Sequence, residues 1–166
     1  MMYQEWGSID AMNDTVPWLS ADEQRAWRSF VRMHQRLSAR LVADLQSHSG
    51  LSGADFEVLV ALTDVPDTRV RFQDLAKEID WEQSRLSHQI RRMIKRGLVA
   101  RDDCAEDGRG AFVLITDQGR EVINAAASKH VVTVRHLVVD ALTPEELAQL
   151  GRLSAKINER IDTRPR

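Results

Sequence analysis

The residues best suited to chemistry in this sequence are the cations between Trp81 and Gly97, in the stretch WEQSRLSHQIRRMIKRG. It carries five Arg or Lys residues and one acidic residue, whereas the whole chain of 166 residues has 23 basic and 25 acidic residues. Guanidinium and ammonium groups bind phosphate, and Arg, Ser and His also form hydrogen bonds with base edges. Because the net charge is only −2, binding to nucleic acid would have to come from this local patch.

The same stretch has the apolar spacing of an amphipathic helix. At about 100° per residue, one face is expected to pack inward and comprises Leu86, Ile90, Met93 and Ile94. The opposite face comprises Ser84, Arg85, His88, Arg91, Arg92 and Lys95. Most runs of charge are simply the solvated face of a helix. The order of the neighbouring elements is therefore needed to distinguish a solvated face from a binding surface.

The elements around the basic helix predict how it is positioned. Helices are expected at about 20–48, 52–63 and 71–79, the first opened by the capping box Ser20–Glu23, and Asp80 is expected to cap the basic helix. The runs 98–103 and 111–116, separated by a glycine-containing turn, predict a β-hairpin. Thr116 and the TPEE box at 143–146 predict the starts of two further long helices. A short helix, a tight turn, a basic helix and a hairpin form the order of a winged helix-turn-helix, whose second helix enters the DNA major groove.

This arrangement assigns a role to each polar residue. Four residues near the start of the basic helix are expected to read bases: Ser84, Arg85, Ser87 and His88. Four cations are expected to hold phosphates: Arg91, Arg92, Lys95 and Arg101. At the hairpin tip, Arg109 lies between two glycines and is expected to enter the minor groove, with Asp107 as its orienting partner.

The sequence resembles the multiple-antibiotic-resistance regulator (MarR) family of bacterial transcription factors. The resemblance rests on FQDLAKEIDWEQSRLSHQIRRMIKRGLVARDD and EDGRGAFVLITDQGREV. The family pattern is matched by the Leu75–Ala76 pair, the Arg-Gly-Leu-Val run at 96–99, the Asp-x-Arg of the wing and the Leu-x-Thr that follows at 114–116. Each motif is weak alone, but the ordered set with this spacing is specific.

The resemblance implies a mainly α fold with a small β-hairpin, in which a winged helix-turn-helix lobe (51–116) is joined to a helical dimerisation lobe (20–50 and 117–162). Residues 1–19 would be a flexible N-terminal extension. It also implies a homodimer on a palindromic operator with half-sites roughly 10 bp apart, more often a repressor than an activator. Family members often bind small aromatic ligands between the lobes, and the residues that would line such a pocket are Trp18, Trp27, His34 and Phe56.

Other classes of function are less favoured. No glycine-rich phosphate loop or nucleophile elbow is present, so we do not expect an enzyme. The five histidines lack metal-ligand spacing, no cofactor is implied, and Cys104 lies among acidic residues that disfavour a reactive thiolate. The N-terminus does not resemble a signal peptide, no apolar run is long enough for a membrane helix, and one cysteine suits the reducing cytoplasm. A sequence-indifferent architectural DNA binder and a winged-helix protein-interaction module remain as alternatives.

Overall fold

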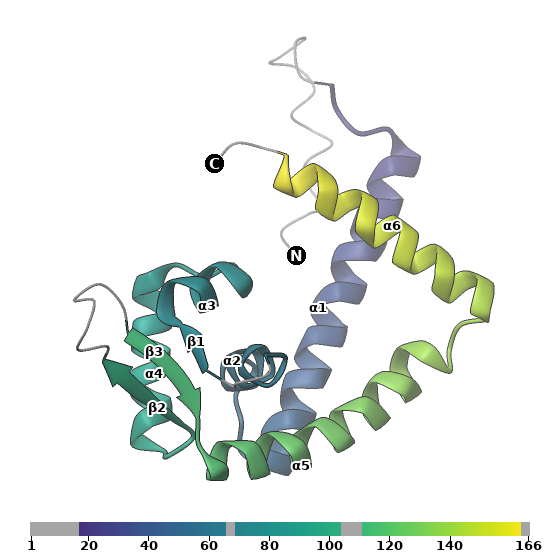
Figure 1. The fold of residues 1–166 in the computed structure, drawn as a ribbon. Coiled ribbons are helices and arrows are strands. Elements are labelled where there is room, and N and C mark those ends of the chain that lie inside the picture. The colour runs from purple at the N-terminus through teal and green to yellow at the C-terminus, as the bar shows by residue number, and fades with distance from the viewer. Residues whose placement is uncertain (1–16, 66–68, 104–110, 164–166) are drawn as a thin grey trace. The chain divides into compact units, whose positions relative to one another are not determined.

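The computed structural model describes residues 17–65, 69–103 and 111–163 (Figure 1). The helices are α1 (Ala21–Ser49), α2 (Gly53–Thr63), α3 (Phe72–Glu78), α4 (Gln83–Lys95), α5 (Asp117–Val134) and α6 (Pro144–Asp162). The strands are β1 (Arg69–Arg71), β2 (Val99–Asp103) and β3 (Ala111–Ile115), and a π-helical turn, Arg135–Val139, follows α5. The predicted class, mainly helical with a small β element, is confirmed.

The chain divides into two compact units, Met1–Leu37 and Ser38–Arg166, each considered by itself below. In the first unit, α1 begins where its capping box predicts. The Ser20 hydroxyl accepts from the Glu23 backbone at 3.3 Å, and the Glu23 carboxylate accepts from the Ser20 backbone at 2.7 Å. The second unit contains the rest of α1 and all the other elements. In the described part of the chain, no helix combines the length and the apolar character needed to cross a membrane.

A three-stranded antiparallel sheet packs with α3 and α4 in the second unit (Figure 1). The strand order is β1-β3-β2, with Val70 opposite Val113 and Arg101 opposite the same residue from the other side. The sequence predicted only the hairpin β2–β3 and no strand before α3. Strand β1 has only three residues, too few for an alternating pattern to be visible, and its pairing with β3 depends on the tertiary fold.

The core of this unit is apolar and lies between α2, α3, α4, the sheet and α5. Its fully buried large side chains are Leu51, Val58, Leu59, Leu62, Leu75, Leu86, Met93 and Val113. Helix α4 ends in the hydrogen-bond pattern of a Schellman motif, because Leu98 N–H donates to the Met93 carbonyl at 3.0 Å and Gly97 N–H to the Ile94 carbonyl at 2.9 Å. Gly97 has φ +71, the left-handed conformation that this motif requires and that glycine adopts at little cost.

The start of α4 differs from the prediction that Asp80 caps it. The N-cap residue is Glu82, which makes no side-chain capping bond, and Asp80 lies earlier in the turn with φ +50. Asp is one of the few non-glycine residues that tolerate this left-handed region. Asp80 is therefore not the N-cap residue of α4, and its left-handed conformation forms part of the tight turn between α3 and α4.

Candidate nucleic-acid interface

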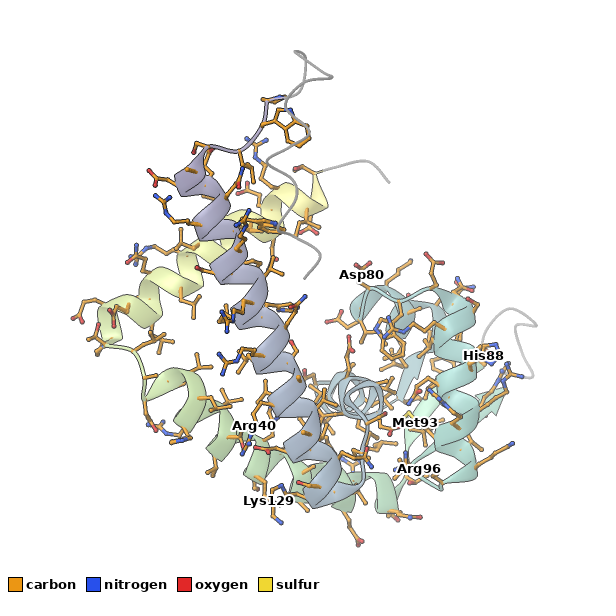
Figure 2. All side chains as sticks on the ribbon, turned by 180° about the vertical axis from the view of Figure 1, so that it is seen from behind. Arg40, Asp80, His88, Met93, Arg96 and Lys129 are labelled. Atoms are coloured by element: carbon orange, nitrogen blue, oxygen red, sulfur yellow. The ribbon has the colours of Figure 1, made fainter. Side chains whose placement is uncertain are left out.

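Helix α4 is anchored by one face and exposes its cations on the other. Leu86, Ile90 and Met93 are buried as predicted, whereas Ile94, also expected inside, is 39% exposed. The place that an apolar residue would take on the inner face is occupied by Gln89, which is 2% exposed. Figure 2 shows His88 and Met93 on different sides of the helix. The exposed residues are Ser84, Arg85, His88, Arg91, Arg92 and Lys95, and Ser87 is half-buried.

The Arg85 guanidinium stacks on Trp81, the residue just before α4. The guanidinium carbon lies 3.8 Å from the centre of the Trp81 ring, a distance suited to a cation–π interaction. Trp81 is itself fixed, because its side chain is 8% exposed and its backbone N–H donates to the Ala76 carbonyl at 2.8 Å. A rigid aromatic surface thus holds a predicted base-reading cation at the N-terminal end of α4. Trp81 was missing from the predicted site, although a Trp four residues before an Arg is a visible signal.

Two other predicted residues form a pair on the same face. The Arg91 guanidinium lies 3.1 Å from His88 Nδ1, and Arg91 Nε donates to the Ser87 carbonyl at 3.4 Å. The structure therefore brings together residues predicted to have different roles, one reading bases and one holding phosphate. Lys95 lies further along α4 and is exposed.

The outer face of the sheet carries cations that the prediction did not include. Arg69 and Arg71 lie over the Phe112 ring, with guanidinium carbons 3.9 and 4.9 Å from its centre. Arg69 also forms an ion pair with Asp102 at 2.8 Å. Arg101, a predicted phosphate contact on β2, is exposed. The predicted wing-tip residues Arg109 and Asp107, and also Cys104, lie outside the described residues.

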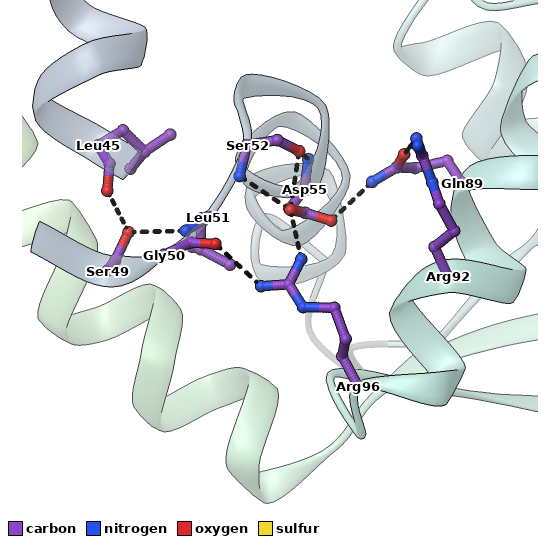
Figure 3. Close-up of polar contacts among 9 residues, drawn as sticks. All are labelled: Leu45, Ser49, Gly50, Leu51, Ser52, Asp55, Gln89, Arg92 and Arg96. Carbon is purple, nitrogen blue, oxygen red and sulfur yellow. Dashed lines mark hydrogen bonds and ion pairs between the residues drawn. The ribbon is translucent and has the colours of Figure 1, made fainter. Parts of the chain in front are cut away.

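One buried carboxylate connects α2 with α4 (Figure 3). Asp55 is 2% exposed and accepts from the Ser52 backbone at 2.8 Å, the Ser52 hydroxyl at 2.7 Å, Gln89 at 2.6 Å and Arg96 at 2.7 Å. Arg96 also donates to the Gly50 carbonyl at 3.0 Å. Burial alone would raise the pKa of Asp55, but the hydrogen bonds from Ser52 and the nearby Arg96 charge outweigh burial and lower that pKa. The carboxylate is therefore charged at neutral pH.

A hollow lies between the end of α1 and α5, within the second unit. Its lining residues are Asp44, Leu45, His48, Ser49, Ala126, Lys129, His130 and Thr133. None of the four predicted ligand residues lines this hollow, although Phe56 contacts the His130 ring with 4.8 Å between ring centres. Trp18, Trp27 and His34 belong to the first unit, where Trp27 and His34 both stack on Phe30. No group of three or more His, Cys, Asp or Glu residues suited to a metal ion occurs within the described ranges.

Helix α3, the turn, α4 and the β2–β3 wing define a winged helix-turn-helix protein. The model of the MarR family matches residues 49–110. AbsC, a MarR family transcriptional regulator from Streptomyces coelicolor, is 38% identical and has a TM-score of 0.85, with 90% of this chain and 100% of AbsC covered. Sco3205 from the same organism, solved in complex with DNA, is 40% identical with a TM-score of 0.83, and 89% of this chain and 92% of Sco3205 are covered. The chain belongs to the MarR family of DNA-binding transcriptional regulators.

A more distant structure confirms the fold alone. A mutant MarR from E. coli complexed with operator DNA is 22% identical and has a TM-score of 0.70, over 78% of this chain and 91% of that one. The recognised family and the winged helix fold were both predicted from the sequence, and both are confirmed.

Proposed function

We propose that this protein is a sequence-specific regulator, acting as a repressor, that binds a palindromic operator as a homodimer. The observation that carries the proposal is the basic face of α4, which is held outward by the buried side chains Leu86, Ile90 and Met93 on the other face. A rigidly anchored helix with exposed Arg, Ser and His side chains suits insertion into the major groove. The proposed role requires no catalysis, so we propose that the protein is not an enzyme, and we expect it to act in the cytoplasm.

Within this proposal, the residues of α4 divide by their position along the helix. Ser84, Arg85, Ser87 and His88, near the N-terminal end, read bases. The later cations Arg91, Arg92 and Lys95, together with Arg101 on β2, hold phosphates, and Arg109, oriented by Asp107, enters the minor groove. Trp81 joins this set, because it holds the Arg85 guanidinium against an aromatic ring.

The experiment that tests the proposal is binding to the DNA upstream of the protein's own gene, with a salt series and a random-sequence competitor. Arg85→Ala should weaken binding to the specific site by roughly 5–150-fold, the equivalent of about 1–3 kcal/mol, and leave random-DNA binding almost unchanged. Arg152→Ala, which removes a cation from α6, is the matched control and should have little effect on either DNA. Equal losses on both DNAs in Arg85→Ala would show a phosphate contact and no base reading.

Two alternatives give different results in the same assay. An architectural DNA binder would lose its binding when random competitor is added, because its affinity comes from phosphate contacts shared by all sequences. A protein-interaction module would bind neither DNA. The exposed basic face disfavours the second alternative, since a protein contact does not need several cations on one side of a helix.

The dimer part of the proposal is supported by α6. This helix has 19 residues, about 28 Å, and none of its side chains is buried in the single chain. Leu150, Leu153, Ile157 and Ile161 are between 36% and 63% exposed. Such a stripe of uncovered apolar side chains is unfavourable in water, and a second copy of the chain would bury it. Sedimentation of the purified protein should therefore give twice the mass of one chain.

The ligand part of the proposal, release from DNA by a small aromatic compound, rests on the family and on one structural feature. The hollow between α1 and α5 has the His130 ring on its wall, in contact with Phe56, and contains both acidic and basic side chains. Trp18, Trp27, His34 and Phe56 are proposed as aromatic contacts on the family resemblance alone, because none of them lines this hollow. Titration of the DNA complex with simple phenols and aromatic acids tests release, and Phe56→Ala should reduce the response if the pocket includes that ring.

A further inference from the structure

The two oxygens of the buried Asp55 carboxylate have different partners (Figure 3). Oδ2 accepts from the backbone and hydroxyl of Ser52 and from Arg96, all between 2.7 and 2.8 Å. Oδ1 accepts from Nε2 of Gln89 at 2.6 Å. The Oδ2 contacts alone cap α2 and pair the charge, so neither task requires a polar side chain at position 89.

The Asp55 carboxylate determines which way the Gln89 amide faces. An ionised carboxylate only accepts hydrogen bonds, so the NH2 group of Gln89 must point toward Asp55. The carbonyl oxygen Oε1 must then point in the opposite direction, where it accepts from the guanidinium of Arg92. Because Gln89 is 2% exposed, water does not compete for its amide, and the orientation is well defined.

We propose that Asp55 and Gln89 are positioning residues that hold the Arg92 side chain ready for a DNA phosphate. This inference rests on the proposed function, in which Arg92 contacts the DNA backbone. A long Arg side chain loses conformational freedom when it binds, and a hydrogen bond formed beforehand reduces that loss. The bond to Gln89 involves Nη2, and a guanidinium has five N–H donors, so others remain for the phosphate.

The burial of an amide on the apolar face of α4 supports this role. The neighbouring inward positions are Leu86, Ile90 and Met93, and an apolar side chain at 89 would pack among them without the cost of burying a polar group. The Gln89 side chain forms hydrogen bonds with Asp55 and with Arg92. Asp55 is buried, whereas Arg92 is on the exposed face of α4. The buried Asp55 carboxylate thus fixes the Gln89 amide, and the amide in turn orients Arg92 on the surface proposed to meet DNA.

The test combines Gln89→Met with Arg92→Ala in a double-mutant cycle on the operator. Gln89→Met keeps the size and shape of the side chain but removes the acceptor for Arg92. We expect it to weaken binding about threefold to tenfold, the effect of ordering one long side chain, and to have no further effect in the Arg92→Ala background. Gln149→Met, on exposed α6, is the matched control and should bind like the wild type.

Several outcomes would overturn the inference. Equal losses from Gln89→Met with and without Arg92 would assign Gln89 to packing alone. If the wild-type protein binds its operator and Gln89→Met or Arg92→Ala binds it equally well, the hydrogen-bonded series Asp55–Gln89–Arg92, here called the relay, positions no DNA contact. Failure of the wild-type protein to bind specific DNA would instead contradict the proposed function.

NMR relaxation tests the same inference without DNA, and the variant Asp55→Asn provides a test that does not depend on the folding of Gln89→Met. NMR relaxation of the Arg92 guanidinium Nε–H in the free protein should show a more mobile side chain in Gln89→Met than in the wild type. Asp55→Asn should produce the same increase, because an amide at position 55 allows Gln89 to turn over and present its NH2 group to Arg92. Equal Arg92 mobility in the wild type and both variants would contradict the relay directly.

Discussion

The buried carboxylate of Asp55 offers the sharpest test of how this fold is held together. Asp55→Ala removes the acceptor of four hydrogen bonds: two from Ser52, one from Gln89 and one from Arg96. The backbone of Ala can still form α2, and the Ser52 hydroxyl can still cap it, because that hydroxyl accepts from the backbone N–H of residue 55 at 3.1 Å. The loss therefore measures the side-chain network.

The magnitude follows from the exposure of each partner. The Gln89 amide, buried at 2% exposure, would be left without its acceptor, which costs about 1–3 kcal/mol. Loss of the carboxylate half of the capping box adds about 0.5–1 kcal/mol. Arg96 has a side chain that is 43% exposed and can turn to water, so the lost ion pair contributes at most about 1 kcal/mol. The free energy of unfolding should fall by about 1.5–5 kcal/mol in total.

Urea unfolding at pH 7, at one fixed protein concentration, measures this change, since the stability of a dimer depends on concentration. Asp140→Ala is the matched control, because it removes an Asp–Arg pair of 3.0 Å whose side chains are 53% and 61% exposed. It should change the free energy of unfolding by less than about 0.5 kcal/mol. A loss below about 1 kcal/mol in Asp55→Ala, or a loss equal to that of the control, would refute the reasoning.

The same residue predicts a pH dependence. Because the pKa of Asp55 is lowered in the folded protein, its contribution to stability is fully present above the unfolded pKa, about 4, and is lost as the pH falls through the folded pKa. The unfolding free energy of Asp55→Ala should therefore fall less steeply below about pH 4 than that of the wild type. Arg96→Met, which removes a cause of the lowered pKa, should move the acid transition of the protein to higher pH.

Three further predictions concern other parts of the chain. Ile157→Glu should convert the dimer to monomers in sedimentation, because it places a charge on the apolar stripe of α6, whereas Arg152→Glu should leave the mass unchanged. In urea unfolding, Gly119→Ala should destabilise the fold by more than about 2 kcal/mol, since a Cβ there would lie 2.0 Å from the Leu98 carbonyl oxygen. The control Glu121→Ala, on the exposed side of α5, should change the free energy of unfolding little. Thr143→Ala should cost about 1 kcal/mol and increase amide exchange in the first turn of α6, because the Thr143 hydroxyl accepts from the Glu146 backbone; unchanged exchange would contradict the capping assignment.

The local features of the fold could be predicted because they depend on residues close together in the sequence. The capping boxes predicted at 20–23 and 143–146 join Ser20 to Glu23 and Thr143 to Glu146, in each case across three residues. The inward placement of Leu86, Ile90 and Met93 follows from helical spacing alone. Asp80 shows where this reasoning fails. Asp is a residue type that often caps helices, but the turn before α4 places Asp80 in a left-handed conformation.

The network around Asp55 could not be predicted in this way. Gln89 and Asp55 are separated by 34 residues and Arg96 and Asp55 by 41, and no local pattern indicates that they meet. Helical spacing placed Ile94 inside and gave Gln89 no role, whereas in the structure Ile94 is exposed and Gln89 is buried against Asp55 of α2. The polar residue is tolerated in the interior only because a carboxylate from another helix accepts its hydrogen bond.

The sequence by itself therefore determined which surface carries the charge, since an amphipathic helix separates its apolar and cationic residues by their spacing. Membership of the MarR family and the winged helix fold also followed from ordered motifs along the chain. Only the tertiary structure decided that Arg69 and Arg71 lie over Phe112, and that the Asp55 carboxylate turns the Gln89 amide oxygen toward Arg92. The physical reason is that a charge needs only its own residue, whereas a defined side-chain direction needs a partner that the fold brings within contact distance.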